Sequence, residues 1–198
     1  MGEEHMILGK WFRLHFVENE GMAWGWKFGE SGGWGKLALT IFRLGAVIFG
    51  VYYINKIINQ KFNKGFIVCV GLIFAGAFGN LIDSLFYGII FENSDDRMLN
   101  VAKFLPNGGG YGTFLHGKVV DMLYFPIIDS HYPSWVPWVG GKEFEFFSPV
   151  FNIADMSIST GLIIILLFQK RFFKQQEDTE KHHTIETKTP VNDEAQIL

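Results

Sequence analysis

Three aspartates that lie within or beside apolar sequence are the side chains of this chain best suited to chemistry. Asp83 lies late in a long apolar run, Asp121 lies in the apolar stretch His116–Pro126, and Asp155 lies at the start of a further apolar run. An ionised carboxylate is costly in an apolar medium unless it faces a protein interior or water. These carboxylates are therefore candidate site residues.

Asp121 and Asp155 bracket a segment whose two ends return to the same face of the predicted membrane, so their side chains are able to meet. Two carboxylates in one confined site do not both ionise cheaply, and one keeps a proton while the other acts as a base. Such a dyad activates water for attack on a peptide carbonyl without a metal. The alternative is structural: Asn152 caps a helix, and Asp155 complements the helix dipole.

Asn80 and Asp83 are three residues apart and therefore share one face of a helix. Gly76 and Gly79 precede them and allow a neighbouring helix to approach closely. We expect a polar clamp in which Asn80 donates a hydrogen bond to Asp83, so that both residues support a site contributed by other side chains.

The composition excludes several classes of function. There are 17 Lys and Arg against 20 Asp and Glu, a net charge of −3, so we expect no nucleic-acid partner. The single cysteine, Cys69, excludes an intrachain disulfide and a multi-cysteine metal site. We expect neither a metal nor another cofactor. Aromatic residues form 17% of the chain and charged residues 19%, a balance that favours contact with lipid.

Three apolar runs are long enough to span a membrane, which takes roughly 20 helical residues: Leu37–Ile58, Phe66–Phe91 and Val150–Phe168. The chain is predicted to be an α-helical integral membrane protein with three spans. Basic residues crowd the turn between the first two runs and follow the third, so both places are predicted to be cytoplasmic. Residues 1–36 and 92–149 then lie outside, and the polar tail 174–198 is predicted to be a disordered cytoplasmic segment.

The outer segments carry further patterns. Trp11–Val17 alternates apolar and polar residues, which predicts a half-buried strand or a segment lying flat at the membrane interface. His116–Pro126 is too short to span and is expected to lie against the outer membrane surface. Met1–Lys10 lacks the apolar run of an export signal, so we expect a preceding span that delivers the first outer segment.

Four short motifs follow one another along the chain, an Asn-x-Gly block, a Gly-Asn…Asp block and two blocks that end in an aspartate: Asn19–Gly25, Gly79–Asp83, Val119–Asp121 and Phe151–Asp155. Their order resembles that of the lipoprotein signal peptidase family, the bacterial membrane aspartyl peptidases that process prolipoproteins. The resemblance covers roughly Trp11 to Phe173, which would form one membrane peptidase domain (1–173).

The resemblance implies that Asp121 and Asp155 are the catalytic dyad. It implies that other residues order the site or hold the substrate: Asn19, Gly21, Asn80, Asp83 and Asn152. The implied substrate is a prolipoprotein that carries diacylglycerol on its lipobox cysteine and is cleaved just before it. The implied location is the bacterial inner membrane, with the site on the outer, periplasmic face beneath a small β cradle. Membrane lipid is the other expected partner.

Three departures from the family pattern stand out. The family has four spans, and its first span carries an Asp-Gln-x-x-Lys pattern that is absent here. Ser84 stands where the family usually has arginine, so a charge partner for Asp83 must come from elsewhere or be absent. The outer connection is longer than the family core needs, around 93–110. Two alternatives therefore stay open, a non-enzymatic membrane scaffold or lipid-binding subunit, and an inactive, N-terminally truncated form of the enzyme.

Overall fold

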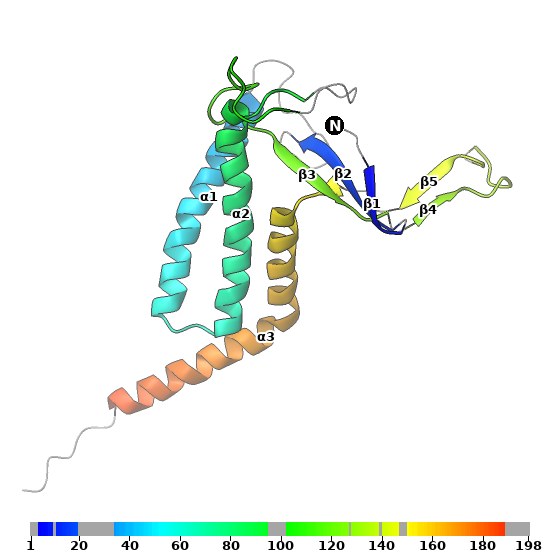
Figure 1. The fold of residues 1–198 in the computed structure, drawn as a ribbon. Coiled ribbons are helices and arrows are strands. Elements are labelled where there is room, and N and C mark those ends of the chain that lie inside the picture. Colours follow the sequence, from blue (N-terminus) through cyan, green and yellow to red (C-terminus); the bar gives the residue numbers. More distant parts are fainter. Residues whose placement is uncertain are drawn as a thin grey trace, which may run out of the picture.

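The computed structural model describes residues 4–9, 11–19, 34–94, 102–126, 128–138, 140–146 and 150–188. Within these ranges the chain forms a helical part and a small antiparallel β part, which lies toward the end of the helical part where α1 and α3 begin and α2 ends (Figure 1). Gly21 and the residues around it lie outside the described ranges.

The helical part contains three helices that are long and apolar enough to cross a membrane, among the residues that the structure describes. They are α1 (Trp34–Asn59), α2 (Lys64–Ile90) and the first part of α3 (Ile153–Lys188), up to Phe173. The prediction of three spans is confirmed. The third helix begins three residues later than the apolar pattern indicates, because Val150–Phe151 forms a short strand, β6.

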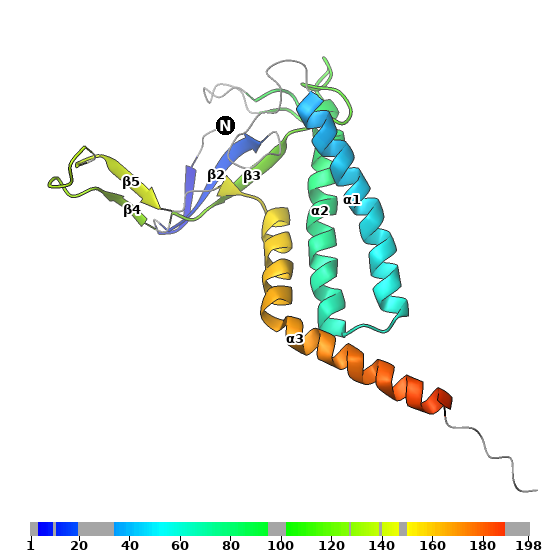
Figure 2. The same cartoon turned by 180° about the vertical axis from the view of Figure 1, so that it is seen from behind.

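α2 is the central helix and packs against both α1 and α3 (Figure 2). Near the turn that connects α1 to α2, the three helices share an apolar core, whose buried members are Ile57, Phe66, Cys69 and Phe172. The tight turn between α1 and α2 is closed by Asn63, whose side chain accepts hydrogen bonds from the backbone of Gly65 and Phe66 and so caps α2. Cys69 of α2 is buried.

α3 changes direction near the turn between α1 and α2 and continues to Lys188 (Figures 1 and 2). The backbone is therefore helical over 174–188, where the polar composition predicts disorder. This segment contains many Gln, Glu and Lys residues and neither glycine nor proline, so helix propensity is favourable although no apolar face marks it. Residues 189–198 lie outside the described ranges.

The β part is a four-stranded antiparallel sheet in the order β1-β2-β3-β6. Its strands are β1 (Glu4–Leu8), β2 (Phe12–Asn19), β3 (Val119–Tyr124) and β6. The strand predicted over Trp11–Val17 is confirmed by β2. The stretch His116–Pro126, which we expect to lie against the outer membrane surface, contains β3, and β3 pairs with β2 on one side and with β6 on the other.

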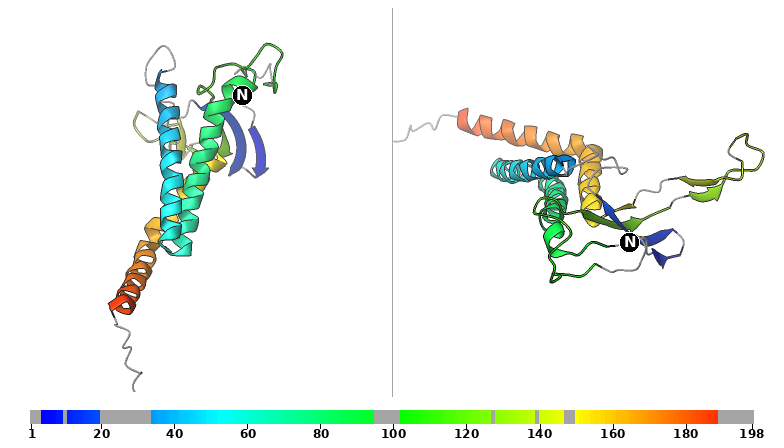
Figure 3. Two further views of the ribbon diagram at one scale, coloured as in Figure 1. Left: turned by 90° about the vertical axis from the view of Figure 1, so that its left-hand side faces the viewer. Right: turned by 90° about the horizontal axis from the view of Figure 1, so that it is seen from above.

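A separate hairpin of β4 (Ile128–His131) and β5 (Glu143–Phe146) extends sideways from the helices, as the view from above shows (Figure 3). Trp135 and Trp138 lie in the connection between its strands and are almost fully exposed, at 80% and 95%. Exposed indole rings of this kind are typical of the headgroup region of a membrane. The hairpin thus carries two of the tryptophans of the long connection between α2 and α3.

Candidate active site

Asp121 lies on the buried face of β3 and is only 4% exposed. Each of its carboxylate oxygens accepts a hydrogen bond from an asparagine amide. Asn19 at the end of β2 donates to Oδ2 at 2.8 Å, and Asn152 donates to Oδ1 at 2.8 Å. Because β2 is paired with β3 through this region, the sheet register itself brings Asn19 beside Asp121. Two side-chain amides therefore hold the carboxylate in one orientation.

Asp155 lies in the first turn of α3, and its carboxylate is held from two directions. The Nδ2 of Asn80 on α2 donates to its Oδ1 at 2.9 Å. The backbone N–H of Asn152 donates to Oδ2 at 3.4 Å, while the Asp155 N–H donates to the Asn152 side chain at 2.9 Å. The last two contacts form a reciprocal capping box. The predicted capping role is confirmed, and the carboxylate also accepts a hydrogen bond from Asn80 of another helix, α2.

The prediction that Asn80 donates a hydrogen bond to Asp83 is wrong, because the Asn80 amide donates to Asp155 instead. Asn80 faces α3 and is 5% exposed. Its Oδ1 accepts a hydrogen bond from Asn152 at 3.2 Å. Spacing along one helix cannot reveal a partner on another helix. Asn80 is thus a member of the site rather than a remote support.

Asn152 joins the two aspartates. Its Nδ2 donates to Asp121 and to Asn80, and its Oδ1 accepts from the Asp155 backbone. Its position follows from the sheet, because β6 pairs with β3 and α3 begins directly after Asn152. One buried amide therefore connects a strand residue with a helix residue 34 positions further along the chain. All of its polar atoms have partners, as expected for a buried amide.

Close packing between α2 and α3 determines where Asp155 lies along α2 relative to Asn80. A Cβ at Gly76 would lie 2.3 Å from the backbone oxygen of Ala154, so only glycine fits there. At Gly79 the nearest atom would be 3.6 Å away, an ordinary contact. The predicted close helix approach is confirmed at Gly76. Because Ala154 precedes Asp155, this contact places the carboxylate within reach of Asn80, one turn further along α2.

Burial raises the pKa of Asp121 above its ordinary value, and the charge of Asp155 acts in the same direction. The hydrogen bonds from Asn19 and Asn152 and the charge of Arg43 act in the opposite direction, because they favour the anion. A carboxyl group with a raised pKa that also senses a second carboxylate is suited to share one proton with it. The geometry can therefore position an acid and a base beside one another.

Arg43 on α1 is a site residue that the motifs do not reveal. Its Nη1 donates to the Ser84 hydroxyl on α2 at 2.7 Å, and its charge acts on Asp155, Asp121 and Asp83. The charge partner that Asp83 requires thus comes from another helix. A lone arginine in the apolar run 37–58 is the available sequence signal. Asp83 itself also forms a hydrogen bond with Tyr87, one turn later on α2.

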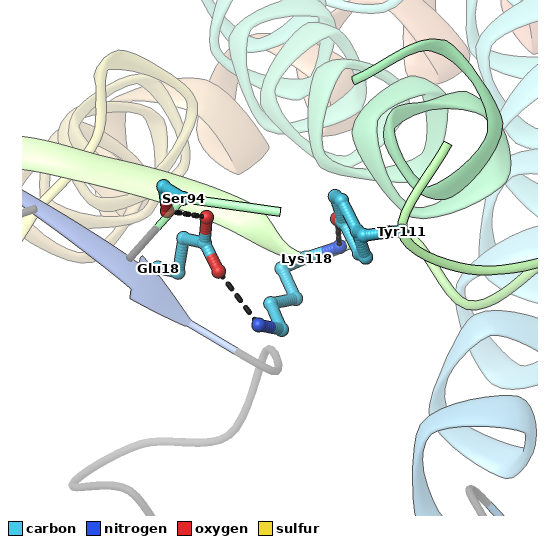
Figure 4. Close-up of polar contacts among 4 residues, drawn as sticks. All are labelled: Glu18, Ser94, Tyr111 and Lys118. Atoms are coloured by element: carbon cyan, nitrogen blue, oxygen red, sulfur yellow. Dashed lines mark hydrogen bonds and ion pairs between the residues drawn. The ribbon is translucent and has the colours of Figure 1, made fainter. Parts of the chain in front are cut away.

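A polar cluster outside the dyad fastens the connection between α2 and β3 to β2 (Figure 4). The Lys118 ammonium forms an ion pair with Glu18 at 2.6 Å, and Glu18 also accepts a hydrogen bond from Ser94. The Lys118 backbone donates to the Tyr111 hydroxyl at 2.6 Å. Burial raises the pKa of Tyr111, which therefore stays neutral. Glu18 precedes Asn19, so the cluster helps to place the amide that holds Asp121.

The chain matches the model of the signal peptidase II family over residues 1–171. It is 46% identical to a lipoprotein signal peptidase of Porphyromonas gingivalis over 172 residues, 86% of this chain and 72% of the relative. The chain belongs to the signal peptidase II family. A lipoprotein signal peptidase of Amoebophilus asiaticus is 36% identical over 170 residues, 85% of this chain and 66% of that protein. One solved structure, a bacterial membrane enzyme, aligns with all of this chain and 79% of its own at 23% identity and a TM-score of 0.46.

Membership of the signal peptidase II family makes this protein a multi-pass membrane peptidase that acts on lipoprotein precursors. This result favours the peptidase over the non-enzymatic scaffold. The structure joins five of the predicted site residues by hydrogen bonds: Asn19, Asn80, Asp121, Asn152 and Asp155. Asp83 is linked to them through the charge of Arg43, and Gly21 lies outside the described residues.

Proposed function

We propose that this signal peptidase II is an aspartyl endopeptidase whose catalytic groups are Asp121 and Asp155, in one domain over residues 1–173. The observation that carries the proposal is the hydrogen bonding of Asn152 to both aspartates, through its side chain to Asp121 and through a capping box to Asp155. Carboxylates oriented by amides in a buried site are prepared to act on one water molecule.

In the proposed reaction the dyad holds one proton at the start. The ionised carboxylate takes a proton from water while the water oxygen attacks the scissile carbonyl carbon. The protonated carboxyl group stabilises the developing oxyanion by hydrogen bonding. When the C–N bond breaks, a proton from the dyad moves to the departing amine, and the pair again holds one proton. Asn19, Asn80 and Asn152 keep both carboxylates in place through these proton transfers.

The proposed substrate is a prolipoprotein whose lipobox cysteine already carries diacylglycerol, cleaved just before that cysteine. Support comes from the sequence motifs and from the position of the dyad, with Asp121 on β3 and Asp155 in the first turn of a helix long and apolar enough to cross a membrane. The basic residues at the opposite end support a cytoplasmic inner end: Lys56, Lys61, Lys64, Lys170 and Arg171. We therefore propose the inner membrane, with the active site on its periplasmic face.

Asparagine substitutions at each aspartate test the dyad. Asp121→Asn and Asp155→Asn preserve shape but remove the proton-transfer groups, so cleavage of a lipidated precursor is expected to fall at least about 100-fold. Asp129→Asn on β4 is the matched control and is expected to cleave at the wild-type rate. Cleavage is followed by the mass of the precursor in detergent micelles, together with a thermal melt of each variant. Wild-type cleavage by either dyad variant would refute the mechanism.

The substrate class is tested separately with one peptide in two forms. The diacylglyceryl-modified peptide is expected to be cleaved before its cysteine, and the unmodified peptide is expected to resist. Equal cleavage of both forms would contradict the lipid requirement and leave the dyad intact.

A further inference from the structure

Arg43 is a cation in the apolar middle of α1, between Lys36 and Lys56 near the two ends of the helix. It lies nine residues after Trp34, about 14 Å along the helix axis, and its side chain is half-buried. A charge at this depth is retained where it faces a protein interior and performs a function. Thr40, one turn earlier on the same face, is fully buried and donates to the Leu115 carbonyl at 2.9 Å, so this face of α1 is turned toward the protein.

A continuous path of hydrogen bonds leads from Arg43 to the dyad. The Nη1 of Arg43 donates to the Ser84 hydroxyl at 2.7 Å, and Ser84, which is fully buried, donates to the Asn80 carbonyl at 2.8 Å. The side chain of Asn80 in turn donates to Asp155 at 2.9 Å. The path crosses from α1 through α2 to α3. Arg43 is therefore anchored on the same turn of α2 that holds Asp155.

The charge of Arg43 acts on aspartates of three different elements, namely Asp155 of α3, Asp121 of β3 and Asp83 of α2. Lys36 of α1 acts on Asp83 as well. Within a protein that excludes water, such interactions are several times stronger than in bulk solvent. A cation beside a carboxylate pair favours its ionised forms and so lowers the pH at which the pair loses each proton.

We propose that Arg43 is a positioning residue for catalysis, held by Ser84, whose charge sets the pH range in which the Asp121–Asp155 pair carries one proton. This inference rests on the proposed dyad. A purely structural arginine would change the amount of folded protein or scale the rate equally at every pH. An arginine that sets the proton affinity of the dyad moves the pH–activity profile itself.

The test is the pH profile of kcat/KM for Arg43→Gln, Arg43→Lys and the control Lys56→Gln, which removes a cation from the inner end of the same helix. In Arg43→Gln both limbs are expected to move about one unit toward higher pH. On the acidic limb this shift is about a tenfold loss of activity. Arg43→Lys keeps the charge and is expected to restore most of the wild-type profile. Lys56→Gln is expected to match the wild type.

Ser84→Ala is a second test that leaves the charge present but removes its anchor. Ser84→Ala is expected to move both limbs of the pH profile toward higher pH by a smaller amount than Arg43→Gln. If Arg43→Gln does not fold, the profile of Ser84→Ala tests the inference instead. Profiles that coincide with the wild type in the folded variants would overturn the inference. Asp121→Asn, measured in parallel, separates the two proposals, because its inactivity upholds the dyad even when the Arg43 variants show no shift.

Discussion

Replacing Asn152 separates a helix cap from an active-site contact, because one side chain serves both roles. Asn152→Ala removes the hydrogen bonds to Asp121 at 2.8 Å and to Asn80 at 3.2 Å, and it removes the acceptor for the Asp155 N–H at 2.9 Å. The site is buried, with Asn152 only 6% exposed, so water cannot readily replace these partners. Asn152→Ser keeps a capping oxygen but cannot donate to both of the other residues.

The expected loss of stability follows from these contacts. Loss of a helix cap costs about 1 kcal/mol, and loss of a hydrogen bond to a charged group costs about 2 kcal/mol. Asn152→Ala is therefore expected to lower the free energy of unfolding by about 3 kcal/mol. Asn152→Ser is expected to recover about 1 kcal/mol of this loss through the cap. Asn63→Ala, which removes the cap of α2 at the inner end, is the matched control and is expected to cost about 1 kcal/mol.

The effects of these variants on cleavage are expected to differ from their effects on stability. Asn152→Ala and Asn152→Ser both release Asp121 from its orientation, and a misplaced catalytic group costs about 100-fold in rate. Asn63→Ala is expected to retain wild-type cleavage. Unfolding is measured by denaturant titration in detergent micelles, and cleavage is measured on a lipidated precursor peptide. Wild-type activity in Asn152→Ser would show that Asn152 is only a cap and would refute the reasoning.

Two further predictions address helix packing and proton affinity. Gly76→Ala is expected to lower the free energy of unfolding by about 1–3 kcal/mol and the cleavage rate at least about tenfold, because the new Cβ would meet Ala154 and displace α3. Gly79→Ala is the control and is expected to be tolerated. Equal thermal melts and cleavage rates for the two variants would contradict this prediction. Asn19→Ala removes a donor that favours the Asp121 anion, so the pKa of that carboxyl rises further and both limbs of the pH–activity profile move to higher pH. A profile that is unchanged or displaced to lower pH would contradict it.

Much of the membrane architecture can be predicted from the amino-acid sequence. Hydropathy over about 20 residues predicts each span to within a few positions, because the hydrocarbon core selects for length and apolar composition. The alternation in Trp11–Val17 predicts a strand for a similar local reason. The motifs that contain Asp121 and Asp155 indicate which carboxylates to consider. These features depend on each residue and its near neighbours, or on the medium around them.

The partners of the site residues depend on distant packing. Asn80 is spaced to meet Asp83 but donates to Asp155, because Gly76 lets α3 lie directly against that face of α2. Arg43 is the lone arginine of a largely apolar run, but its partner Ser84 is identified only by the packing of α1 against α2. The rotation of a helix and the depth of its contact follow from side chains on other elements, so no local pattern encodes them. Composition and periodicity therefore predict which acids lie at the ends of the spans, whereas the packing of α1, α2, α3 and the sheet determines the amides and the cation that surround them.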